Sequence, residues 1–379
     1  MKRSFKLLSV ILCLTLSCVF IYNPSHAYTV SAKGYVIINA DTCEVLAGDN
    51  IHRKLSMAST TKIMTAIILA EENTPDKEIT ATEEMVTVEG SSMGLLPGDR
   101  VSYYELMVGM LLPSGNDAAN CAAIAVAGSV EKFAEMMNKK AEEIGMENTH
   151  FVTPSGLDDD EHYSTAYDMA ILTAYALKND CFREIVSQPS ITVTYGNPPY
   201  QRTLYNHNKL LNTYDNCIGV KTGFTKKSGR CLVSAAEKDG CKVIAVTLNA
   251  PSDWNDHKYL LDYGLGCLSR QDVTYNLPVT AVPVVGGTAD FVTVSTERFM
   301  CGCTENSKNK ITADYEILPF TYAPVNPGQT VGKVNYYYKN KLIHSSDILT
   351  VNEVKKAEYN PSFKQRFIYF LKIFLKNYI

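Results

Sequence analysis

The sequence pattern changes near residue 270, and this change constrains the fold of the 379-residue chain more than any other feature. Before it, patterns with a helical period lie between short apolar strand patterns. After it, short alternating runs broken by Gly, Pro and Asn-Lys turns continue to residue 351 without a helical period. We therefore expect two folded domains, residues 28–269 and 270–351. The alternative, in which the later strands extend the first sheet, fits the shift in composition less well.

The first domain is predicted to be α+β. Strand patterns lie at both of its ends, beginning with a hairpin over 33–46 that turns at Asp41-Thr42, and helical patterns lie between them. This order favours an antiparallel sheet flanked by helices, with a helical subdomain inserted. The second domain is expected to be a small β-sandwich-like unit. The strands expected in the first domain, after the hairpin, are 190–195, 217–222, 230–235 and 242–248, and the helices are 103–112, 116–127, 130–144, 164–179, 254–266 and one that begins near Ser59.

The N-terminus has the pattern of an export signal. Basic residues precede an apolar run over 7–22, and Ser25 and Ala27 supply the small residues of a cleavage site. An uncleaved anchor is the alternative, but the run is short against the roughly 20 residues that span a bilayer. We therefore interpret residues 1–27 as a signal peptide and expect an exported protein. It is expected to act outside the cytoplasmic membrane, attached to its outer face or secreted.

The C-terminal residues 352–379 are predicted to form an amphipathic helix. Its aromatic and aliphatic residues Phe363, Phe367, Phe370, Leu371, Phe374 and Tyr378 recur at helical spacing, and its basic residues lie mostly opposite. Such a helix is typical of segments that lie in the plane of a membrane surface. Packing against the protein's own core is the alternative.

The composition argues against several classes of function. A formal net charge of −4 gives no reason to expect a nucleic-acid partner. The sequence contains no P-loop, no dinucleotide-binding glycine pattern and no zinc-type spacing, so neither a cofactor nor a metal is expected. The cysteines that follow the signal peptide are odd in number and mostly scattered singly through apolar segments, which does not predict a shared disulfide framework.

Three short motifs carry the chemistry. They are Ser59-Thr60-Thr61-Lys62, Ser114-Gly115-Asn116 between two predicted helices, and Lys221-Thr222-Gly223 at the end of an apolar strand. We call them the Ser59, Ser114 and Lys221 motifs. Taken alone, the Ser59 motif favours a helix cap followed by an ordinary solvated lysine, and only the three motifs together favour catalysis.

The residue types at these spacings suit nucleophilic catalysis. A serine hydroxyl needs a base within hydrogen-bond reach, and on a helix Lys62 lies on the same face as Ser59. The lysine can accept a proton only if it is partly neutral, which burial and a neighbouring cation favour. Lys221 can supply that cation. Ser114 can relay a proton to the leaving amine, and Asn116 can hold both Lys62 and a substrate amide.

The third motif suits substrate binding. The backbone N–H groups of Ser59 and Phe224 are expected to form an oxyanion hole. Together with Lys221, the hydroxyls of Thr222 and Thr225 suit a substrate carboxylate. Gly223 would let the substrate backbone lie flat along the strand edge.

In this order and in an exported chain, the motifs match the signature of penicillin-binding proteins and class A β-lactamases, with Ser-Gly-Asn in place of Ser-Asp-Asn. The chain resembles a low-molecular-mass penicillin-binding protein of the D-alanyl-D-alanine carboxypeptidase group. Further stretches that carry the resemblance, over roughly residues 30–350, are "YVIINADTCEVL", "SSMGLLPGD", "HFVTPSGLDDDEHYSTAYDMA", "NKLLNTYDNCIGVKTGFTKKSGRCLVSAA" and "GKVNYYYKNKLI".

The resemblance implies both an activity and residue roles. It implies that Ser59 is acylated, Lys62 takes its proton, Ser114 is the second active-site serine and Lys221 binds substrate. The substrate would be the peptidoglycan stem pentapeptide, which loses its terminal D-alanine, and β-lactams would be acylating inhibitors.

Three positions depart from the family pattern. Ser155 stands where relatives often have a histidine, so the part this loop plays in deacylation stays open. The stretch "TLNAPSD" offers no arginine for the substrate carboxylate, which leaves Lys221, the threonines and Arg230 as candidates. Cys43 replaces a glycine expected in the hairpin turn.

Two other functions share these motifs. A β-lactamase would have them, but the chain has no clear Glu-x-x-Leu-Asn loop between Ser114 and Lys221 and has a second domain that such an enzyme does not need. A penicillin-binding sensor or scaffold would be acylated without turnover.

Overall fold

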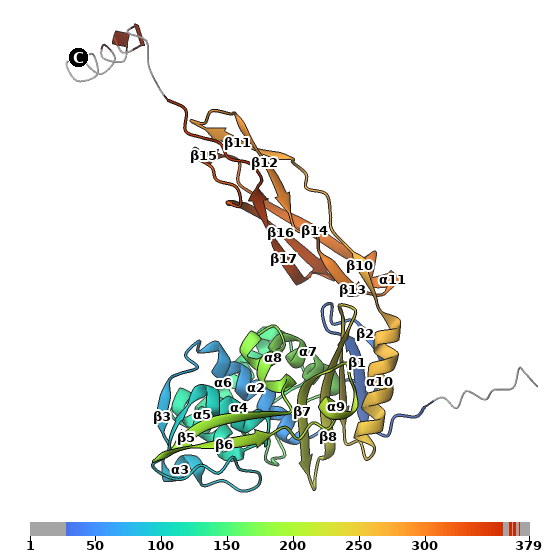
Figure 1. Ribbon diagram of the computed structural model, residues 1–379. Coiled ribbons are helices and arrows are strands. Elements are labelled where there is room, and N and C mark those ends of the chain that lie inside the picture. Colours follow the sequence, from blue (N-terminus) through green and yellow to red (C-terminus); the bar gives the residue numbers. More distant parts are fainter. Residues whose placement is uncertain (1–27, 359–363, 366, 369–370, 372–379) are drawn as a thin grey trace, which may run out of the picture.

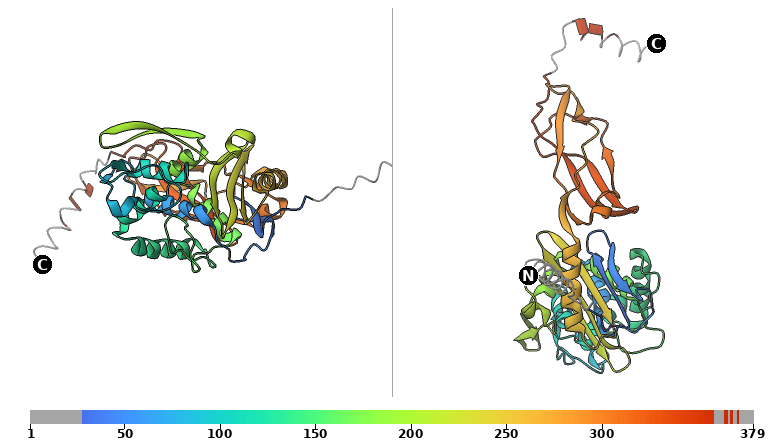
Figure 2. Two further views of the ribbon diagram at one scale, coloured as in Figure 1. Left: turned by 90° about the horizontal axis from the view of Figure 1, so that it is seen from below. Right: turned by 90° about the vertical axis from the view of Figure 1, so that its right-hand side faces the viewer.

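The computed structural model describes residues 28–358, 364–365, 367–368 and 371. They form two domains arranged end to end, with the β domain extending away from the helical part of the molecule (Figures 1 and 2). The predicted signal peptide and most of the predicted terminal helix lie outside the described residues.

A five-stranded antiparallel sheet forms the framework of the first domain. The N-terminal hairpin pairs with strands from the end of the domain, so segments more than 190 residues apart in the chain are neighbours, for example Val36 beside Val246. The predicted α+β fold with an antiparallel sheet is confirmed. In spatial order the strands are β2 (Val45–Asp49), β1 (Gly34–Asn39), β9 (Cys241–Leu248), β8 (Gly229–Lys238) and β7 (Cys217–Thr225).

Both faces of the sheet are covered, which explains why the central strands are apolar throughout. Successive side chains of a strand point to opposite faces. In β1, Val36 and Ile38 pack in the core beneath the inserted helices, while Ile37 packs with Leu260 and Leu261 of α10 (Asp253–Cys267). The sheet therefore lies between α10 on one face and the helical insert on the other (Figure 1).

The central helix of the insert is α2 (Lys62–Glu71), whose residues from Lys62 to Leu69 are all buried. A helix that is buried all round needs apolar residues on every face, which the sequence KIMTAIILAE supplies apart from its first lysine. Its neighbours in the insert are α4 (Tyr103–Leu111), α5 (Asn116–Ala127), α6 (Val130–Ile144), α7 (Ala166–Ala176) and α8 (Asp180–Ser187).

One predicted strand lies outside the main sheet. Strand β5 (Ser190–Gly196) pairs only with β6 (Pro199–Tyr205), and the two form a separate hairpin. The second strand was not expected because its alternation is weak, and only Leu204 of β6 is buried. The other small elements of this domain are β3 (Glu78–Thr80), β4 (Arg100–Ser102), α3 (Glu83–Val86) and α9 (Leu210–Thr213).

The second domain is a separate, almost wholly β unit, as expected. It contains a six-stranded sheet, a two-stranded pair and one short helix, α11 (Glu305–Lys308). The sheet order is β14 (Ile311–Ile317), β16 (Thr330–Tyr338), β17 (Lys341–Thr350), β12 (Phe291–Thr296), β11 (Ala281–Val285) and β15 (Thr321–Tyr322), and the pair is β10 (Ser269–Asp272) with β13 (Met300–Cys303).

The prediction that helix begins at residue 352 is wrong. Residues 352–358 are not helical, and Val354 is buried and bridges to Val325 in the β domain. An apolar residue that completes the β core cannot also lie on a free helix. Helix is present at residues 364–365, 367–368 and 371, while the rest of the predicted segment lies outside the described residues. No helix in the described part of the chain is long and apolar enough to cross a membrane.

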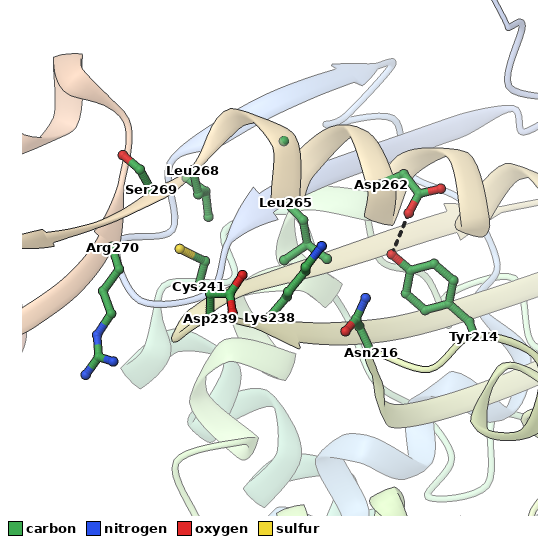
Figure 3. Close-up of a pocket in the computed structure, with 11 residues that line it drawn as sticks. Tyr214, Asn216, Lys238, Asp239, Cys241, Asp262, Leu265, Leu268, Ser269 and Arg270 are labelled. Atoms are coloured by element: carbon green, nitrogen blue, oxygen red, sulfur yellow. Dashed lines mark hydrogen bonds between the residues drawn. The ribbon is translucent and has the colours of Figure 1, made fainter.

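The domain junction is formed by backbone and side chains next to the N-terminal hairpin. The Asn39 Nδ2 group donates a buried hydrogen bond of 2.8 Å to the Gly302 carbonyl, and Thr304 Oγ1 donates to Glu44 at 3.1 Å. A pocket of about 480 Å³ lies nearby and is lined by Cys241, Arg270 and, from the end of α10, Leu265 (Figure 3). It contains no residue of the three motifs.

Candidate active site

Ser59 lies in a 3₁₀ turn, Ala58–Thr61, directly before α2. Its side chain caps neither helix, so the helix-cap interpretation does not hold. The turn is fixed by its own threonines, because Thr60 Oγ1 donates to Met57 O at 2.7 Å and Thr61 Oγ1 donates to Ala58 O at 2.8 Å.

Lys62 is fully buried, and its Nζ contacts three oxygens. The distances are 3.0 Å to Ser59 Oγ, 2.7 Å to Asn116 Oδ1 and 2.7 Å to the Ser155 carbonyl. The two carbonyl oxygens can only accept hydrogen bonds, whereas the serine hydroxyl can also donate. A neutral amine has two N–H donors and one lone pair. When its donors serve the two carbonyls, its lone pair is left for Ser59, which is the geometry of a base.

The surroundings of Lys62 favour this neutral form. Burial lowers its pKa well below the ordinary value, and the nearby charge of Lys221 lowers it further, while Asp117 acts in the opposite direction. Lys221 is buried as well, and this lowers its own pKa to about 7. Its Nζ donates to the Thr222 carbonyl at 2.9 Å. Two buried lysines therefore share one site, and the site disfavours both being charged.

The Ser114 motif joins α4 to α5. Ser114 is buried and has a φ of 66°, in the left-handed region that few residues other than glycine adopt without cost. Asn116 begins α5, and its Nδ2 donates to Glu89 O at 2.6 Å. This bond fixes the amide so that its oxygen faces Lys62.

Strand β7 is the last strand of the sheet, so among the described residues no strand lies beside the backbone groups on its outer side. An unpaired edge can bind an extended peptide through main-chain hydrogen bonds. Gly223 lies on this strand, and a Cβ there would come within 3.1 Å of Ser59 N and 3.0 Å of Met57 O. Glycine at this position therefore keeps the Ser59 N–H accessible.

A cavity of about 280 Å³ brings most of these groups together. From the predicted set it is lined by Ser59, Ser114, Thr222, Gly223 and Phe224, while Lys62, Lys221 and Asn116 are buried. The residues that complete its wall are Ser91, His207, Arg230, Cys231, Asp253 and Trp254.

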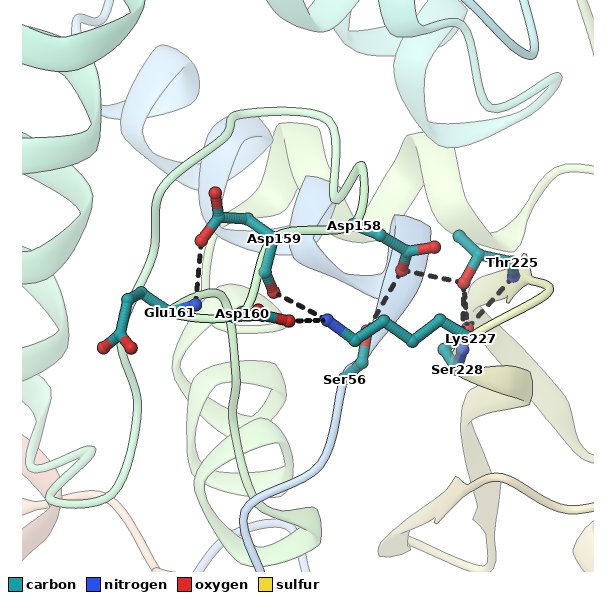
Figure 4. Close-up of polar contacts among 8 residues, drawn as sticks. All are labelled: Ser56, Asp158, Asp159, Asp160, Glu161, Thr225, Lys227 and Ser228. Carbon is teal, nitrogen blue, oxygen red and sulfur yellow. Dashed lines mark hydrogen bonds and ion pairs between the residues drawn. The ribbon is translucent and has the colours of Figure 1, made fainter.

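Thr225, which was predicted to bind substrate, lies outside the wall of this cavity. Its hydroxyl donates to Asp158 Oδ1 at 2.8 Å and contacts Ser228 Oγ at 2.9 Å (Figure 4). Positions 221 and 225 are four residues apart, so on a strand their side chains lie on the same face. Thr225, however, lies at the β7–β8 turn, where it meets the loop that contains Asp158. The sequence alone could not place that loop.

The same loop, residues 153–162, packs against the 3₁₀ turn that carries Ser59. Gly156 has a φ of +84°, and a Cβ there would lie 2.0 Å from Ala58 O, so only glycine allows this approach. His162 Nδ1 accepts from the Val152 N–H at 2.9 Å, and its Nε2 lies 2.8 Å from Thr61 Oγ1. Burial lowers its pKa to about 4, so the ring is neutral and its Nε2–H donates to the threonine. The sequence did not identify this histidine, because no spacing pattern relates it to the three motifs.

Family comparisons agree with the two-domain structure. The family described as D-alanyl-D-alanine carboxypeptidase matches residues 22–252, and the family described as penicillin-binding protein 5, C-terminal domain, matches residues 273–356.

Curated proteins are similar over most of the chain. D-alanyl-D-alanine carboxypeptidase DacF of Bacillus subtilis is 31% identical over 86% of this chain and 87% of its own. D-alanyl-D-alanine carboxypeptidase DacC of Escherichia coli is 31% identical over 88% of this chain and 87% of its own.

Solved structures are similar in fold. Penicillin-binding protein 5 of Haemophilus influenzae has a TM-score of 0.62 at 27% identity, covering 87% of this chain and 99% of its own. The Streptomyces K15 DD-transpeptidase has a TM-score of 0.60 at 32% identity, covering 63% of this chain and 98% of its own.

The coupling of the two lysines predicts a shift in pH dependence. Replacing Lys221 with Ala removes a cation that lowers the pKa of Lys62, so that pKa should rise. Because the base acts when neutral, acylation is lost as pH falls through this pKa, and the loss should begin at a higher pH in the variant. We expect acylation of Ser59 by a fluorescent penicillin to be at least about tenfold slower at neutral pH, or about 1.4 kcal/mol.

The matched control is Lys227→Ala. Lys227 is an exposed lysine on the β7–β8 turn, and it pairs with Asp160 of the 153–162 loop. The pH profile of this variant should coincide with that of the unmodified protein. A Lys221→Ala profile that is unshifted, or shifted to lower pH, would contradict the coupling.

Proposed function

The chain belongs to the D-alanyl-D-alanine carboxypeptidase family of serine peptidases, and we propose that it removes the terminal D-alanine from peptidoglycan stem pentapeptides. The observation that carries the proposal is the arrangement around Lys62, whose two carbonyl partners leave its lone pair to the Ser59 hydroxyl. This arrangement prepares a serine nucleophile with a lysine as its base.

The proposed reaction has two steps. Ser59 Oγ attacks the carbonyl carbon of the penultimate D-alanine, and its proton moves to Lys62 Nζ. The C–N bond to the terminal D-alanine then breaks as the proton held by Lys62 passes through Ser114, which lines the same cavity, to the leaving amine, so that Lys62 is neutral again. A water oxygen then attacks the ester carbon and loses a proton to Lys62, and Lys62 returns this proton to Ser59 Oγ as the ester bond breaks. During both steps the N–H groups of Ser59 and Phe224 stabilise the charge on the carbonyl oxygen.

We infer that Arg230 binds the terminal carboxylate of the substrate. It lines the cavity beside Trp254, and its ion pair with the buried Asp253 is made through Nε at 2.9 Å. A guanidinium has five N–H donors in a planar fork, so donors remain on Nη for a carboxylate. Residues 247–253 contain no arginine that could bind the substrate carboxylate, and we assign this role to Arg230. Thr222 remains with it in the cavity wall, whereas Thr225 does not.

β-Lactams are proposed as acylating inhibitors, because an acyl donor that fits the same cavity would form an ester with Ser59. A β-lactamase would hydrolyse that ester rapidly. Within the part of the chain that the structure describes, no feature favours this function over peptide hydrolysis.

The deciding experiment measures free D-alanine released from a pentapeptide that ends in D-Ala-D-Ala, beside hydrolysis of a β-lactam. We expect D-alanine release with slow β-lactam turnover, and loss of both with Ser59→Ala. The same peptide with an amidated C-terminus should be cleaved at least about tenfold more slowly, since Arg230 would lose its anion. Release of no D-alanine, with rapid β-lactam hydrolysis, would reject the proposal in favour of a β-lactamase.

We propose that the enzyme is exported and held at the outer face of the cytoplasmic membrane by its C-terminal segment. The signal-like N-terminus supports export. Phe367, Ile368 and Leu371 are exposed at 53%, 45% and 39%, and basic residues flank this stretch in the sequence on both sides. An exposed apolar group with neighbouring cations suits a membrane surface that carries anionic lipids.

Deleting residues 361–379 should release the mature protein from membranes and leave its activity on a soluble peptide unchanged, because the catalytic domain does not include this segment. Co-sedimentation with anionic liposomes compares the mature chain with the truncated one. Equal sedimentation would reject the anchor, and a loss of soluble activity would show that the segment packs against the protein's own core.

A further inference from the structure

The loop of residues 91–95 is bound by a carboxylate through its N–H groups and by a guanidinium through its carbonyl groups. It precedes β4 and lies close to the start of α5 and to the β5–β6 hairpin. Ser91 at its beginning lines the catalytic cavity. The loop has no regular secondary structure, so its peptide groups must find partners elsewhere.

The carboxylate of Asp117 binds the N–H groups of this loop. It is buried in the first turn of α5, and it accepts from the backbone N–H of Met93 at 2.9 Å, Gly94 at 3.0 Å and Leu95 at 3.1 Å. The Ser92 hydroxyl adds a fourth bond of 2.6 Å to the same carboxylate.

The guanidinium of Arg202 binds the carbonyl groups of the same loop. Its Nη1 donates to Gly94 O at 2.7 Å and to Met93 O at 3.2 Å. The buried Tyr195 hydroxyl donates to Met93 O at 2.6 Å and accepts from Arg202 Nη1 at 2.8 Å. The guanidinium also lies 4.4 Å from the ring centroid of Tyr195 and 4.1 Å from that of Tyr200, and these rings fix its position.

The loop leads directly to the catalytic base. Ser91 O accepts from the Asn116 N–H at 2.7 Å, and two residues earlier Glu89 O accepts from Asn116 Nδ2. Asn116 Oδ1 in turn is one of the two carbonyl partners of Lys62. A chain of contacts therefore runs from Arg202 through the loop and Asn116 to the lysine.

We propose that Arg202 is a positioning residue for the reaction: by holding the carbonyl side of the 91–95 loop, it keeps Asn116 oriented toward Lys62. Asp117 cannot do this alone, because its carboxylate binds only N–H groups, whereas the Met93 and Gly94 carbonyl groups need donors, which the Arg202 guanidinium and the Tyr195 hydroxyl supply. The Arg202 guanidinium approaches the Gly94 backbone closely, since a Cβ at this position would lie 2.9 Å from Arg202 Nη1. The role in acylation of Ser59 does not depend on the substrate, and its consequence for D-alanine release rests on the proposed function.

The first test is structural and needs no activity. In Arg202→Ala, the amide hydrogens of Met93, Gly94 and Leu95 should exchange with solvent at least about tenfold faster. The reason is that the loop can then open locally without first breaking the hydrogen bonds from Arg202 to its carbonyl groups. The matched control is Arg183→Ala, which removes an arginine of α8 that also donates to a backbone carbonyl, Leu177 O, and that pairs with Asp180. It should leave exchange at these three amides unchanged.

The second test is kinetic. The rate of Ser59 acylation by a fluorescent penicillin should fall at least about tenfold in Arg202→Ala, and Arg202→Lys should restore part of it, because an ammonium keeps the charge but not the fork. In the background of Asn116→Ala, the further effect of Arg202→Ala should be less than about twofold, since the residue then has nothing to position. If Arg202→Ala does not fold, Tyr195→Phe, which removes only the hydroxyl, should show the same changes at smaller size.

Unchanged acylation in Arg202→Ala, with or without faster exchange, would overturn the proposal. So would an equal loss in the presence and absence of Asn116, which would indicate a general structural role. Neither result bears on the proposed function, which fails only if the unmodified enzyme releases no D-alanine.

Discussion

The contact between the buried amine of Lys62 and three oxygens is the interaction on which the rest of the site depends. Burying a charged lysine in the protein interior costs free energy, and this cost falls when the amine loses its proton. Two of its partners are carbonyl oxygens that only accept, so the neutral amine has one orientation that satisfies all three contacts. In that orientation its lone pair faces Ser59. Burial, which elsewhere in the chain serves packing, is here what makes a lysine a base.

The surrounding elements can be understood as supports for this contact. The 153–162 loop supplies the Ser155 carbonyl and holds the nucleophile turn through Gly156 and His162. The 91–95 loop orients Asn116, and the last strand of the sheet places Lys221 close enough to lower the pKa of Lys62. These supports come from distant parts of the chain, so the base forms only when the whole domain is folded.

The sequence predicted the elements whose periodicity is strong and the residues that lie in short motifs. Ser59 and Lys62 could be paired because helical geometry relates positions three apart, and an antiparallel sheet could be expected from apolar strands at both ends of the domain. Features set by tertiary contact could not be predicted. Thr225 follows its motif in sequence, yet Asp158 from another loop binds its hydroxyl. The buried Val354 made residues 352–358 part of the β domain, although the segment was predicted to be helical.

A direct titration of the Lys62 amine tests the central claim. With 13C at the ε position of lysine, nuclear magnetic resonance can follow the amine of the unmodified enzyme as pH changes, and Lys62→Ala assigns its signal. We expect Lys62 to titrate well below the ordinary lysine value of about 10.4, because burial and Lys221 both disfavour its charge. An ordinary lysine pKa in the folded enzyme would contradict the account, since the amine would then be charged at neutral pH and could not take the proton of Ser59.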